Sequence, residues 1–371
     1  MGYPDTFEGF MVEDPKKWST FKRREFKPKK LEPYDVDLEI IACGVCGSDL
    51  HAATSGWGED MMPFPLCPGH EVIGRVVAVG EKVNTLKVGD RAGVGAQIWS
   101  CLEDGCAQCK SGNENYCPKQ VDTYGAKYPD GTISYGGYSS HIRAHEYFTF
   151  PIPSALSTTL VAPMLCAGLT VFSPLKRSNI GPGSTVGIVG VGGLGHFAIQ
   201  FAAALGAEVY ALSHSESKVE DAKKMGAKEV ILTNKEKWSD KWKLKFDMLL
   251  NTADAADGFD MSEYLGCLNV HGRFWNAALP DKPLPQIKAF DLATNGAFIC
   301  GSHIGNREEC LEMLKLAADK GIEGWVETID ISEDGCKEAL ERLNKNDVRY
   351  RFTLVGFDKA FGNQAAKEVE K

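Results

Sequence analysis

The sequence predicts an α/β protein, one part of which is a doubly wound parallel sheet. Expected strands at 208–213, 229–232 and 246–251 alternate with expected helices, and this alternation is typical of parallel sheets. A glycine-rich turn joins a short apolar run after Ser184 to a helix over 197–205. Residues 72–95 are instead rich in valine and glycine, which predicts short strands of a small barrel or curled sheet.

The glycine-rich turn has the spacing G-x-G-x-x-G at Gly190, Gly192 and Gly195. In a strand-turn-helix context the first glycine permits a tight turn, and the second lets the backbone approach a pyrophosphate. The third lets the helix pack closely against the strand, and the helix N-terminus then holds the phosphates. The turn therefore predicts a dinucleotide site.

The 371 residues are enough for two domains, and proline residues near 151–153 indicate a linker. We expect a catalytic domain formed by residues 1–156 and 305–371, to which a strand at 348–355 returns, and a cofactor domain at 157–304. The net charge of −9 disfavours nucleic acid or an anionic membrane as a partner. Without a visible signal peptide, we expect a cytoplasmic protein whose twelve cysteines are thiols or metal ligands.

Two sets of residues have the composition of metal sites. The polar segment 101–117 contains Cys101, Cys106, Cys109 and Cys117, a set that suits a closed tetrahedral structural zinc site. The alternative is a group of reactive or buried thiols, but buried thiols do not cluster in so hydrophilic a segment. The second set is dispersed, at Cys46, His70 and Cys166, and matches the Cys₂His composition of some catalytic zinc sites. Each of these residues alone is weak evidence, because a lone cysteine on an apolar helix is more often part of the core.

Seven motifs distributed along the chain resemble those of the zinc-dependent medium-chain alcohol dehydrogenases, in the cinnamyl alcohol dehydrogenase branch with its NADP-dependent enzymes of broad specificity. They are Cys46–His51, Gly69–Glu71, Gly136–Ser139, Ala162–Thr170, Gly190–Gly195, Gly301–Gly305 and Asn346–Thr353. The resemblance implies a GroES-like β-barrel catalytic domain and a Rossmann cofactor domain, with two zinc ions per chain.

The resemblance also assigns roles to residues. It implies that Cys46, His70 and Cys166 bind the catalytic zinc and that Glu71 approaches the metal when the fourth position lacks substrate. Asp49 accepts a hydrogen bond from His70. Ser48 begins a proton relay through the cofactor ribose to His51, the alternatives being a turn-capping serine and a solvated histidine.

The chain departs from the family pattern at two places. The interval between Cys101 and Cys106 is longer than the usual C-x-x-C, so the structural lobe must differ locally. His303 stands where plant relatives carry an aromatic residue, so the substrate pocket is not simply theirs.

The end of the second expected strand indicates which cofactor is bound. NAD-specific proteins usually place an acidic residue there, but this chain has Ser213, followed by His214 and Lys218. A carboxylate would repel a 2′-phosphate, whereas serine and lysine bind one, so we expect NADP(H). NADP-linked relatives often have an arginine where this chain has His214. A neutral histidine stacks and bonds less strongly than arginine, so we expect a weaker preference for NADP(H) over NAD(H). The remaining cofactor contacts that the resemblance implies are Gly47, Ser48, His51, Thr170, Val191, Gly193, Leu194, Thr252, Ser302, Ile304 and Arg351, the last at the pyrophosphate.

These observations predict a zinc alcohol dehydrogenase that transfers hydride between NADP(H) and medium to large primary alcohols or aldehydes, aromatic ones included. Trp57, Trp99 and Ile304 are candidate pocket residues, although both tryptophans could equally be packing residues. We expect a homodimer. The alternatives are a polyol or secondary-alcohol dehydrogenase of the same fold, and a non-catalytic NADPH-binding protein, which the intact metal ligands and Ser48 argue against.

Overall fold

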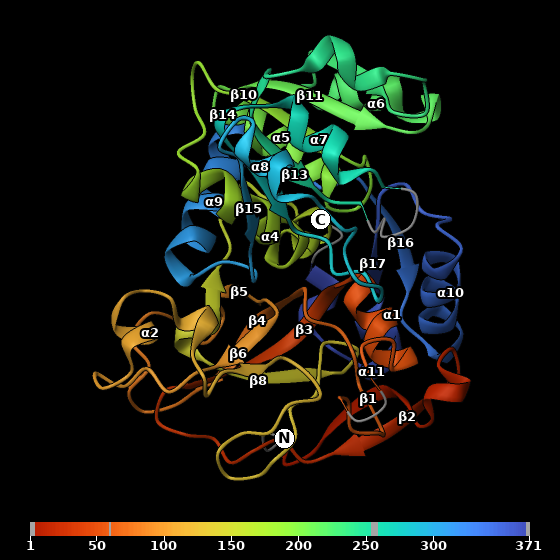
Figure 1. Ribbon diagram of the computed structural model, residues 1–371. Coiled ribbons are helices and arrows are strands. Elements are labelled where there is room, and N and C mark those ends of the chain that lie inside the picture. Colours follow the sequence, from red (N-terminus) through yellow and green to blue (C-terminus); the bar gives the residue numbers. More distant parts are fainter. Residues whose placement is uncertain (1–3, 59–60, 254–258, 369–371) are drawn as a thin grey trace. The chain divides into compact units, whose positions relative to one another are not determined.

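The computed structural model describes residues 4–58, 61–253 and 259–368, which form two compact units (Figure 1). The first unit contains the chain up to Cys166 and again from Asn306, and the second unit contains Ala167–Gly305. The chain thus leaves the first unit at 166 rather than at 156. Residues 157–166 include helix α3 (Thr158–Val161) and the 3₁₀ segment η4 (Ala162–Leu165), which contact strands of the first unit.

A seven-stranded sheet organises the first unit. Its order is β16-β17-β3-β4-β5-β9, with β8 also paired to β3. The strands are β3 (Asp35–Val45), β4 (Val72–Val79), β5 (Arg91–Val94), β8 (His141–His145), β9 (Thr149–Pro151), β16 (Val326–Asp330) and β17 (Arg351–Val355). The closing strand β17 lies between β16 and β3, parallel to the first and antiparallel to the second.

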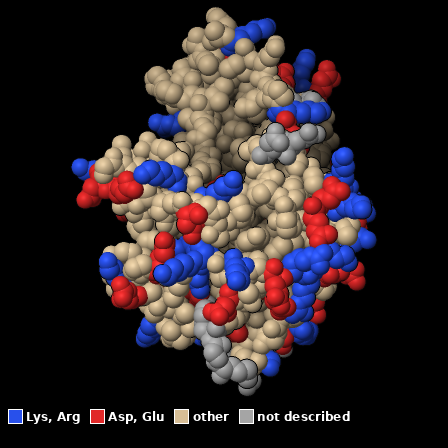
Figure 2. Space-filling model, turned by 90° about the horizontal axis from the view of Figure 1, so that it is seen from below, with Lys and Arg blue, Asp and Glu red and all other residues tan. Residues whose placement is uncertain are grey.

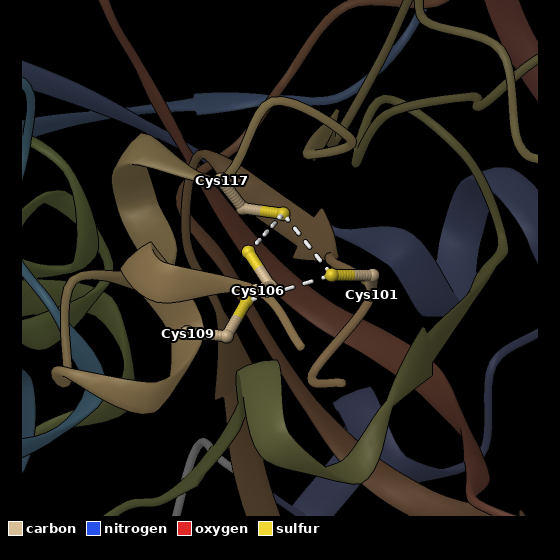
Figure 3. A group of neighbouring side chains, drawn as sticks. All are labelled: Cys101, Cys106, Cys109 and Cys117. Carbon is tan, nitrogen blue, oxygen red and sulfur yellow. Dashed lines mark hydrogen bonds between the residues drawn. The ribbon is translucent and has the colours of Figure 1, made fainter. Parts of the chain in front are cut away.

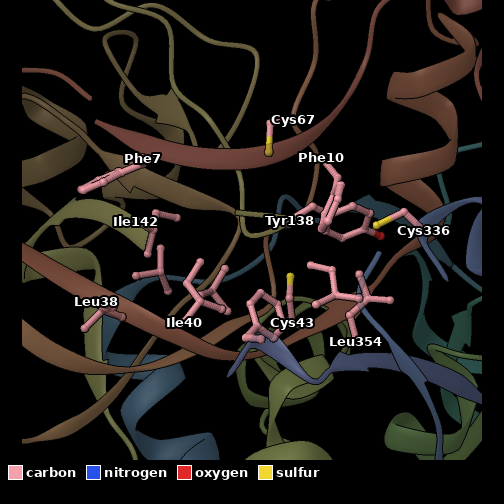
Figure 4. Close-up of a cluster of buried hydrophobic side chains, with 14 of the residues drawn as sticks. Phe7, Phe10, Leu38, Ile40, Cys43, Cys67, Tyr138, Ile142, Cys336 and Leu354 are labelled. Atoms are coloured by element: carbon pink, nitrogen blue, oxygen red, sulfur yellow. The ribbon is translucent and has the colours of Figure 1, made fainter. Parts of the chain in front are cut away.

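Shorter elements complete the first unit. The small sheets are β1 (Phe7–Val12) with β2 (Phe21–Phe26), and β6 (Gln97–Trp99) with β7 (Val121–Asp122). The helices are α1 (Gly47–Thr54), α2 (Ala107–Lys110), α9 (Arg307–Lys320), α10 (Glu333–Asn344) and α11 (Phe357–Phe361). Apolar side chains from β1, β3, β8, α10 and β17 meet in one buried core (Figure 4), whose members include Phe7, Leu38, Ile40, Ile142, Cys336 and Leu354.

The second unit is a doubly wound parallel sheet, as predicted. It has six strands in the order β12-β11-β10-β13-β14-β15. Its strands are β10 (Thr185–Val189), β11 (Glu208–Ser213), β12 (Glu229–Leu232), β13 (Phe246–Asn251), β14 (Leu268–Asn276) and β15 (Phe298–Gly301). Its helices are α4 (Ala167–Arg177), α5 (Gly195–Ala204), α6 (Val219–Lys224), α7 (Met261–Cys267) and α8 (Ala289–Ala293). The strand order reverses beside β10, and such a switch point is where these sheets bind ligands.

Within the described residues, no single helix is long and apolar enough to cross a membrane. One bent pair, Thr158–Leu165 with Ala167–Arg177, passes that test by length and composition only.

Candidate metal and cofactor sites

The first candidate metal site lies at one end of the β4-β3-β17 part of the sheet. The backbone N–H of Gly44, near the end of β3, donates a hydrogen bond at 2.9 Å to the carbonyl oxygen of Glu71, which lies just before β4. Phe352 of β17 pairs with Val45 of β3, so Arg351 lies near Cys46. The sheet register therefore gathers Cys46, His70, Glu71 and Arg351, although they come from the ends of three strands that lie far apart in the sequence.

Four donor atoms in this region could hold a metal ion. The sulfurs of Cys46 and Cys166, a ring nitrogen of His70 and a carboxylate oxygen of Glu71 all lie within 4.8 Å of one another, and all four residues are buried. Ligand atoms around one tetrahedral zinc ion lie about 3.3–3.8 Å apart, given zinc–ligand distances of about 2.0–2.3 Å. The set therefore fits zinc in composition and spacing.

Cys166 contributes to this cluster from a point where the helical structure is interrupted. The sequence predicts a helix that carries Cys166, but this is wrong in detail. The residue lies between η4 and α4 with φ −123° and ψ −68°, outside helical geometry. An interrupted helix thus presents its sulfur toward the other donors.

Asp49 fixes the orientation of this donor set. Its carboxylate is fully buried and accepts hydrogen bonds from the backbone N–H groups of Cys46 at 2.9 Å and Gly69 at 3.0 Å. It lies 3.1 Å from Nδ1 of His70. With the Nδ1 proton directed at Asp49, Nε2 of His70 keeps its lone pair for a metal. The Tyr138 hydroxyl, 3.5 Å away, also donates toward Asp49, a contact that the sequence reasoning missed.

Electrostatic effects in the cluster make one thiol easier to ionise than the other. The hydrogen bond from Cys166 lowers the pKa of Cys46 well below its usual range, although burial opposes this and Arg351 adds to it. The same hydrogen bond, together with burial, raises the pKa of Cys166. Burial tends to lower the pKa of His70, but the negative charge of Asp49 raises it overall. A metal that binds both thiols as thiolates must release protons.

Arg351 forms a buried ion pair with Glu71. Its side chain is 5% exposed and that of Glu71 is fully buried. The Glu71 carboxylate packs directly against Gly44. A Cβ at position 44 would lie 2.1 Å from the Glu71 Oε2, so only glycine fits there. The sequence reasoning missed this pairing. The role of Arg351 at a pyrophosphate stays a prediction.

Helix α1 begins directly after Cys46 and carries the residues of the predicted proton relay. Ser48 lies in its first turn, with its Oγ 3.8 Å from the Cys46 sulfur, and Gly47 is the first helical residue. His51 lies one turn later on the same helix and is half-buried. The ring of Trp57 stacks on that of His51, with centroids 5.1 Å apart and planes at 19°.

The second candidate metal site is the four-cysteine lobe (Figure 3). The sulfur of Cys101 lies 3.5 Å from that of Cys117 and 3.8 Å from that of Cys109, and Cys106 lies 3.9 Å from Cys117. These are the spacings of four thiolates around one zinc ion. The longer first interval is accommodated by a turn in which Leu102 has φ +49° and the Cys106 N–H donates to the Glu103 carbonyl at 2.9 Å.

The cysteine lobe is tied to the start of α9. Glu114, which is 1% exposed, accepts a hydrogen bond from the backbone N–H of Arg307 at 2.6 Å. Asn306 donates from its side chain to the Gly112 carbonyl at 2.6 Å. A carboxylate at a helix N-terminus accepts a hydrogen bond from a free N–H group and interacts favourably with the helix dipole.

The predicted dinucleotide turn lies between β10 and α5 in the second unit. Gly190 has φ +89°, which a residue with a side chain rarely adopts. A Cβ at Gly195 would lie 1.9 Å from the Gly190 carbonyl oxygen, whereas one at Gly192 would meet no atom of the described residues within 4 Å. The Thr252 hydroxyl donates to the carbonyls of Val189 and Gly190, both at 2.9 Å, and so braces the turn.

Hydroxyl groups and one amine gather at the end of β11. Ser213 Oγ exchanges hydrogen bonds with the backbone of Ser215, and the hydroxyls of Ser215 and Ser217 lie 2.9 Å apart. Lys218 Nζ donates to the Val191 carbonyl at 2.8 Å, which places this amine beside the glycine turn. The sequence reasoning missed Ser215 and Ser217, which the alternation of serines after Ser213 could have indicated.

The remaining predicted cofactor residues lie on several elements. Thr170 is in α4, Val191, Gly193 and Leu194 are in the glycine turn, and exposed His214 follows β11. Ser302 and Ile304 follow β15, where the Ser302 hydroxyl donates to the Ile304 carbonyl at 3.3 Å. Ile304 has φ +54°, a rare conformation for a β-branched residue and one that often marks functional sites.

Charges on the face shown in Figure 2 are mixed, with Lys and Arg lying among Asp and Glu. Several exposed pairs are in contact, including Arg23 with Glu8 and Lys22 with Glu333.

Comparisons with known proteins identify the family. Residues 32–154 match the alcohol dehydrogenase GroES-like domain, and residues 193–319 match the zinc-binding dehydrogenase family. The NADP-dependent alcohol dehydrogenase 6 of Saccharomyces cerevisiae is 44% identical over 98% of this chain and 100% of its own length. The mannitol dehydrogenase of Petroselinum crispum is 42% identical over 86% of this chain and 93% of its own. The structure of a cinnamyl alcohol dehydrogenase from Sorghum bicolor matches with a TM-score of 0.88 and 32% identity, covering 95% of this chain and 98% of that one. The chain therefore belongs to the zinc-binding medium-chain alcohol dehydrogenases, with their GroES-like and Rossmann-type domains.

Proposed function

We propose that this alcohol dehydrogenase works with NADP(H), mainly as a reductase of medium to large aldehydes, aromatic ones included. The observation that carries the proposal is the buried set of Cys46, His70 and Cys166 with the Ser48 hydroxyl beside it. The relatives named for NADP-dependent, cinnamyl alcohol and mannitol activities support the cofactor and the substrate class.

In this proposal the first metal set is the catalytic site and the four cysteines are a structural site. When bound, zinc polarises the substrate oxygen and NADPH supplies the hydride. Cys46, Cys166 and His70 would hold the metal, and Asp49 would keep the His70 ring in place. Glu71, held by Arg351 within the donor set, is available as an alternative ligand when no substrate is present.

The proton follows a route along α1. Ser48 would donate a proton to the reduced oxygen, and His51 would supply the replacement proton from solvent. A hydroxyl can both donate and accept a proton, and an imidazole ring can accept a proton on one nitrogen and donate one from the other. Both side chains project from one short helix that begins at a metal ligand, which supports this order.

We infer the cofactor preference from the end of β11. Ser213 and Lys218 would bind the 2′-phosphate, and the Ser215 and Ser217 hydroxyls add further partners. Removing a charge-assisted phosphate contact costs about 1.5–3 kcal/mol, or roughly ten- to a hundredfold in affinity. Lys218→Ala should raise the KM for NADPH by about that factor and leave the KM for NADH nearly unchanged. Ser213→Asp should reverse the preference, because a carboxylate repels the phosphate and binds a ribose.

A substrate panel tests the function. We would measure kcat/KM with cinnamaldehyde-type aldehydes, aliphatic aldehydes, secondary alcohols and polyols, each with NADPH and NADH. Higher efficiency with mannitol than with any aldehyde would favour the polyol alternative, and absence of turnover in the zinc-loaded protein would favour a non-catalytic role. Ser48→Ala should lower kcat strongly while the Kd for NADPH stays near that of the parent, and His51→Gln should lower kcat less because water substitutes in part.

We also propose that the chain forms a homodimer in the cytoplasm. β15 is an edge strand of the parallel sheet, and Phe298, Ile299 and the nearby Phe290 of α8 are exposed to 50%, 39% and 76%. An exposed apolar edge strand is a typical association surface. Phe298→Glu should convert a dimer to a monomer in sedimentation equilibrium, and a monomeric parent would contradict the proposal. None of the twelve cysteines forms a disulfide, which supports a reducing compartment that cell fractionation tests.

A further inference from the structure

Tyr124 contacts both members of the pair formed by His70 and Asp49. Its ring centroid lies 5.5 Å from that of His70, with the two ring planes at 51°, and the tyrosine is buried. Its side chain also forms a hydrogen bond with the Asp49 carboxylate. Tyr124 therefore touches both partners of the contact that orients the imidazole ring.

Backbone contacts fix Tyr124 from both sides. The hydroxyl of the preceding residue, Thr123, donates to the Gly95 carbonyl at 2.5 Å. The N–H of the following residue, Gly125, donates to the Ser134 carbonyl at 3.0 Å. The position of the phenol is thus set by a segment that carries none of the four donors of the first metal site.

The Tyr124 ring packs in a small apolar cluster with Ala52 and Leu66. Ala52 lies on α1, which begins directly after Cys46, and Leu66 lies on the segment that leads to His70. Both neighbours of the ring therefore belong to segments that carry metal ligands, so the ring lies against the supports of the site.

The phenol of Tyr124 acts as a hydrogen-bond donor. Burial, then the negative charges of Asp49 and Cys46 and the hydrogen bond with Asp49, raise the pKa of Tyr124 well above its usual range. The phenol therefore keeps its proton, and an ionised carboxylate can only accept. Asp49 is fully buried, and a buried carboxylate depends on such hydrogen bonds because burial removes its hydration.

We propose that Tyr124 is a positioning residue for the catalytic metal, which acts through Asp49 and His70. This inference rests on the proposed function, since it concerns a ligand of that site. Asp49 lies 3.1 Å from Nδ1 of His70 and so directs Nε2 toward the metal. Tyr124 supports this arrangement at both members, the carboxylate through its hydroxyl and the imidazole through its ring.

Zinc affinity tests this role independently of turnover. Tyr124→Phe removes the hydroxyl and keeps the ring, so the fold should be retained. Loss of a hydrogen bond behind a metal ligand typically weakens metal binding by about 10–100-fold, so we expect zinc affinity at this site to fall about tenfold. The affinity of the four-cysteine site should stay parental. A chromophoric zinc chelator titrated into the zinc-loaded, cofactor-free protein measures both affinities, and Cys166→Ala identifies the zinc ion that belongs to the catalytic site.

Tyr128→Phe is the matched control. Tyr128 is as buried as Tyr124, at 6% exposed, and its hydroxyl lies 3.5 Å from the Arg143 carbonyl instead of at the metal site. Tyr128→Phe should leave both zinc affinities parental. Cobalt bound at the catalytic site gives a second measurement, because its visible absorption depends on ligand geometry. Tyr124→Phe should shift these absorption bands, and Tyr128→Phe should not.

Parental zinc affinity or parental cobalt bands in Tyr124→Phe would overturn the inference. Equal weakening of zinc binding in Tyr124→Phe and Tyr128→Phe would also overturn it, because the cause would then be a general loss of packing. Two zinc ions retained by Cys166→Ala would instead overturn the catalytic site of the proposed function. The two failures are therefore distinguishable.

Discussion

Two substitutions in the glycine turn should separate its structural role from its binding role. Gly195→Ala would place a Cβ 1.9 Å from the Gly190 carbonyl oxygen and 3.0 Å from the Thr252 hydroxyl. Real Cβ contacts are not shorter than 3.0 Å, so strand and helix must separate by about 1 Å. Overpacking of this kind costs about 2–3 kcal/mol of unfolding free energy, which lowers the melting temperature by about 4–12 °C in a domain of this size.

Gly192→Ala is the matched variant, because its Cβ would meet nothing within 4 Å in the part of the chain that the structure describes. We expect an unchanged melting temperature and a Kd for NADPH raised at least about tenfold, since the methyl group occupies the place where the backbone must approach the phosphates.

Scanning calorimetry of the cofactor-free protein measures the first effect, and titration of NADPH fluorescence measures the second. A parental melting temperature in Gly195→Ala would refute the packing argument. Parental NADPH affinity in Gly192→Ala would refute the phosphate-approach argument.

Elemental analysis of protein purified without added metal should give two zinc ions per chain. Cys166→Ala should keep the fold, lose one zinc and abolish turnover, whereas Cys106→Ala should lower stability, because structural zinc contributes to folding. Glu114→Ala should cost about 1.5–3 kcal/mol of unfolding free energy by removing the acceptor at the Arg307 N–H, and Glu114→Gln should cost less, as chemical denaturation can show. Burial lowers the pKa of His145 to about 4, so the unfolded chain binds that proton more tightly. Unfolding free energy should therefore fall as pH falls from about 6.5 to about 4, and His145→Gln should flatten this slope.

Features set by neighbouring residues could be predicted from the sequence. The strands at 208–213, 229–232 and 246–251 agree with the structure, because each is a short apolar run between a helix stop and a turn. The glycine turn could be predicted for the same reason, since its backbone requirements act over six residues. The cysteine lobe was also visible, because its four sulfurs lie within one loop.

Features that depend on distant pairing could not be predicted. Glu71 and Arg351 meet only because β17 inserts between β16 and β3, and the residues on either side carry no sign of that register. The break of the helix at Cys166 is also hidden, because the surrounding residues are uniformly apolar. The stacking of Trp57 on His51 depends on the left-handed conformation of Ser55, where a sequence rule would expect glycine.

The position of β17 also has a consequence for biosynthesis. The second unit is one continuous stretch, Ala167–Gly305, so all of it has been synthesised before the last part of the chain. The first unit must wait, because β17 fills the gap between β16 and β3 and is among the last elements to emerge. At about 5–20 residues per second, the ribosome needs several seconds to make residues 306–371. During that interval Cys46, His70 and Cys166 are already made but lack the strand that completes their sheet, so metal loading of this site is expected only once β17 has been synthesised.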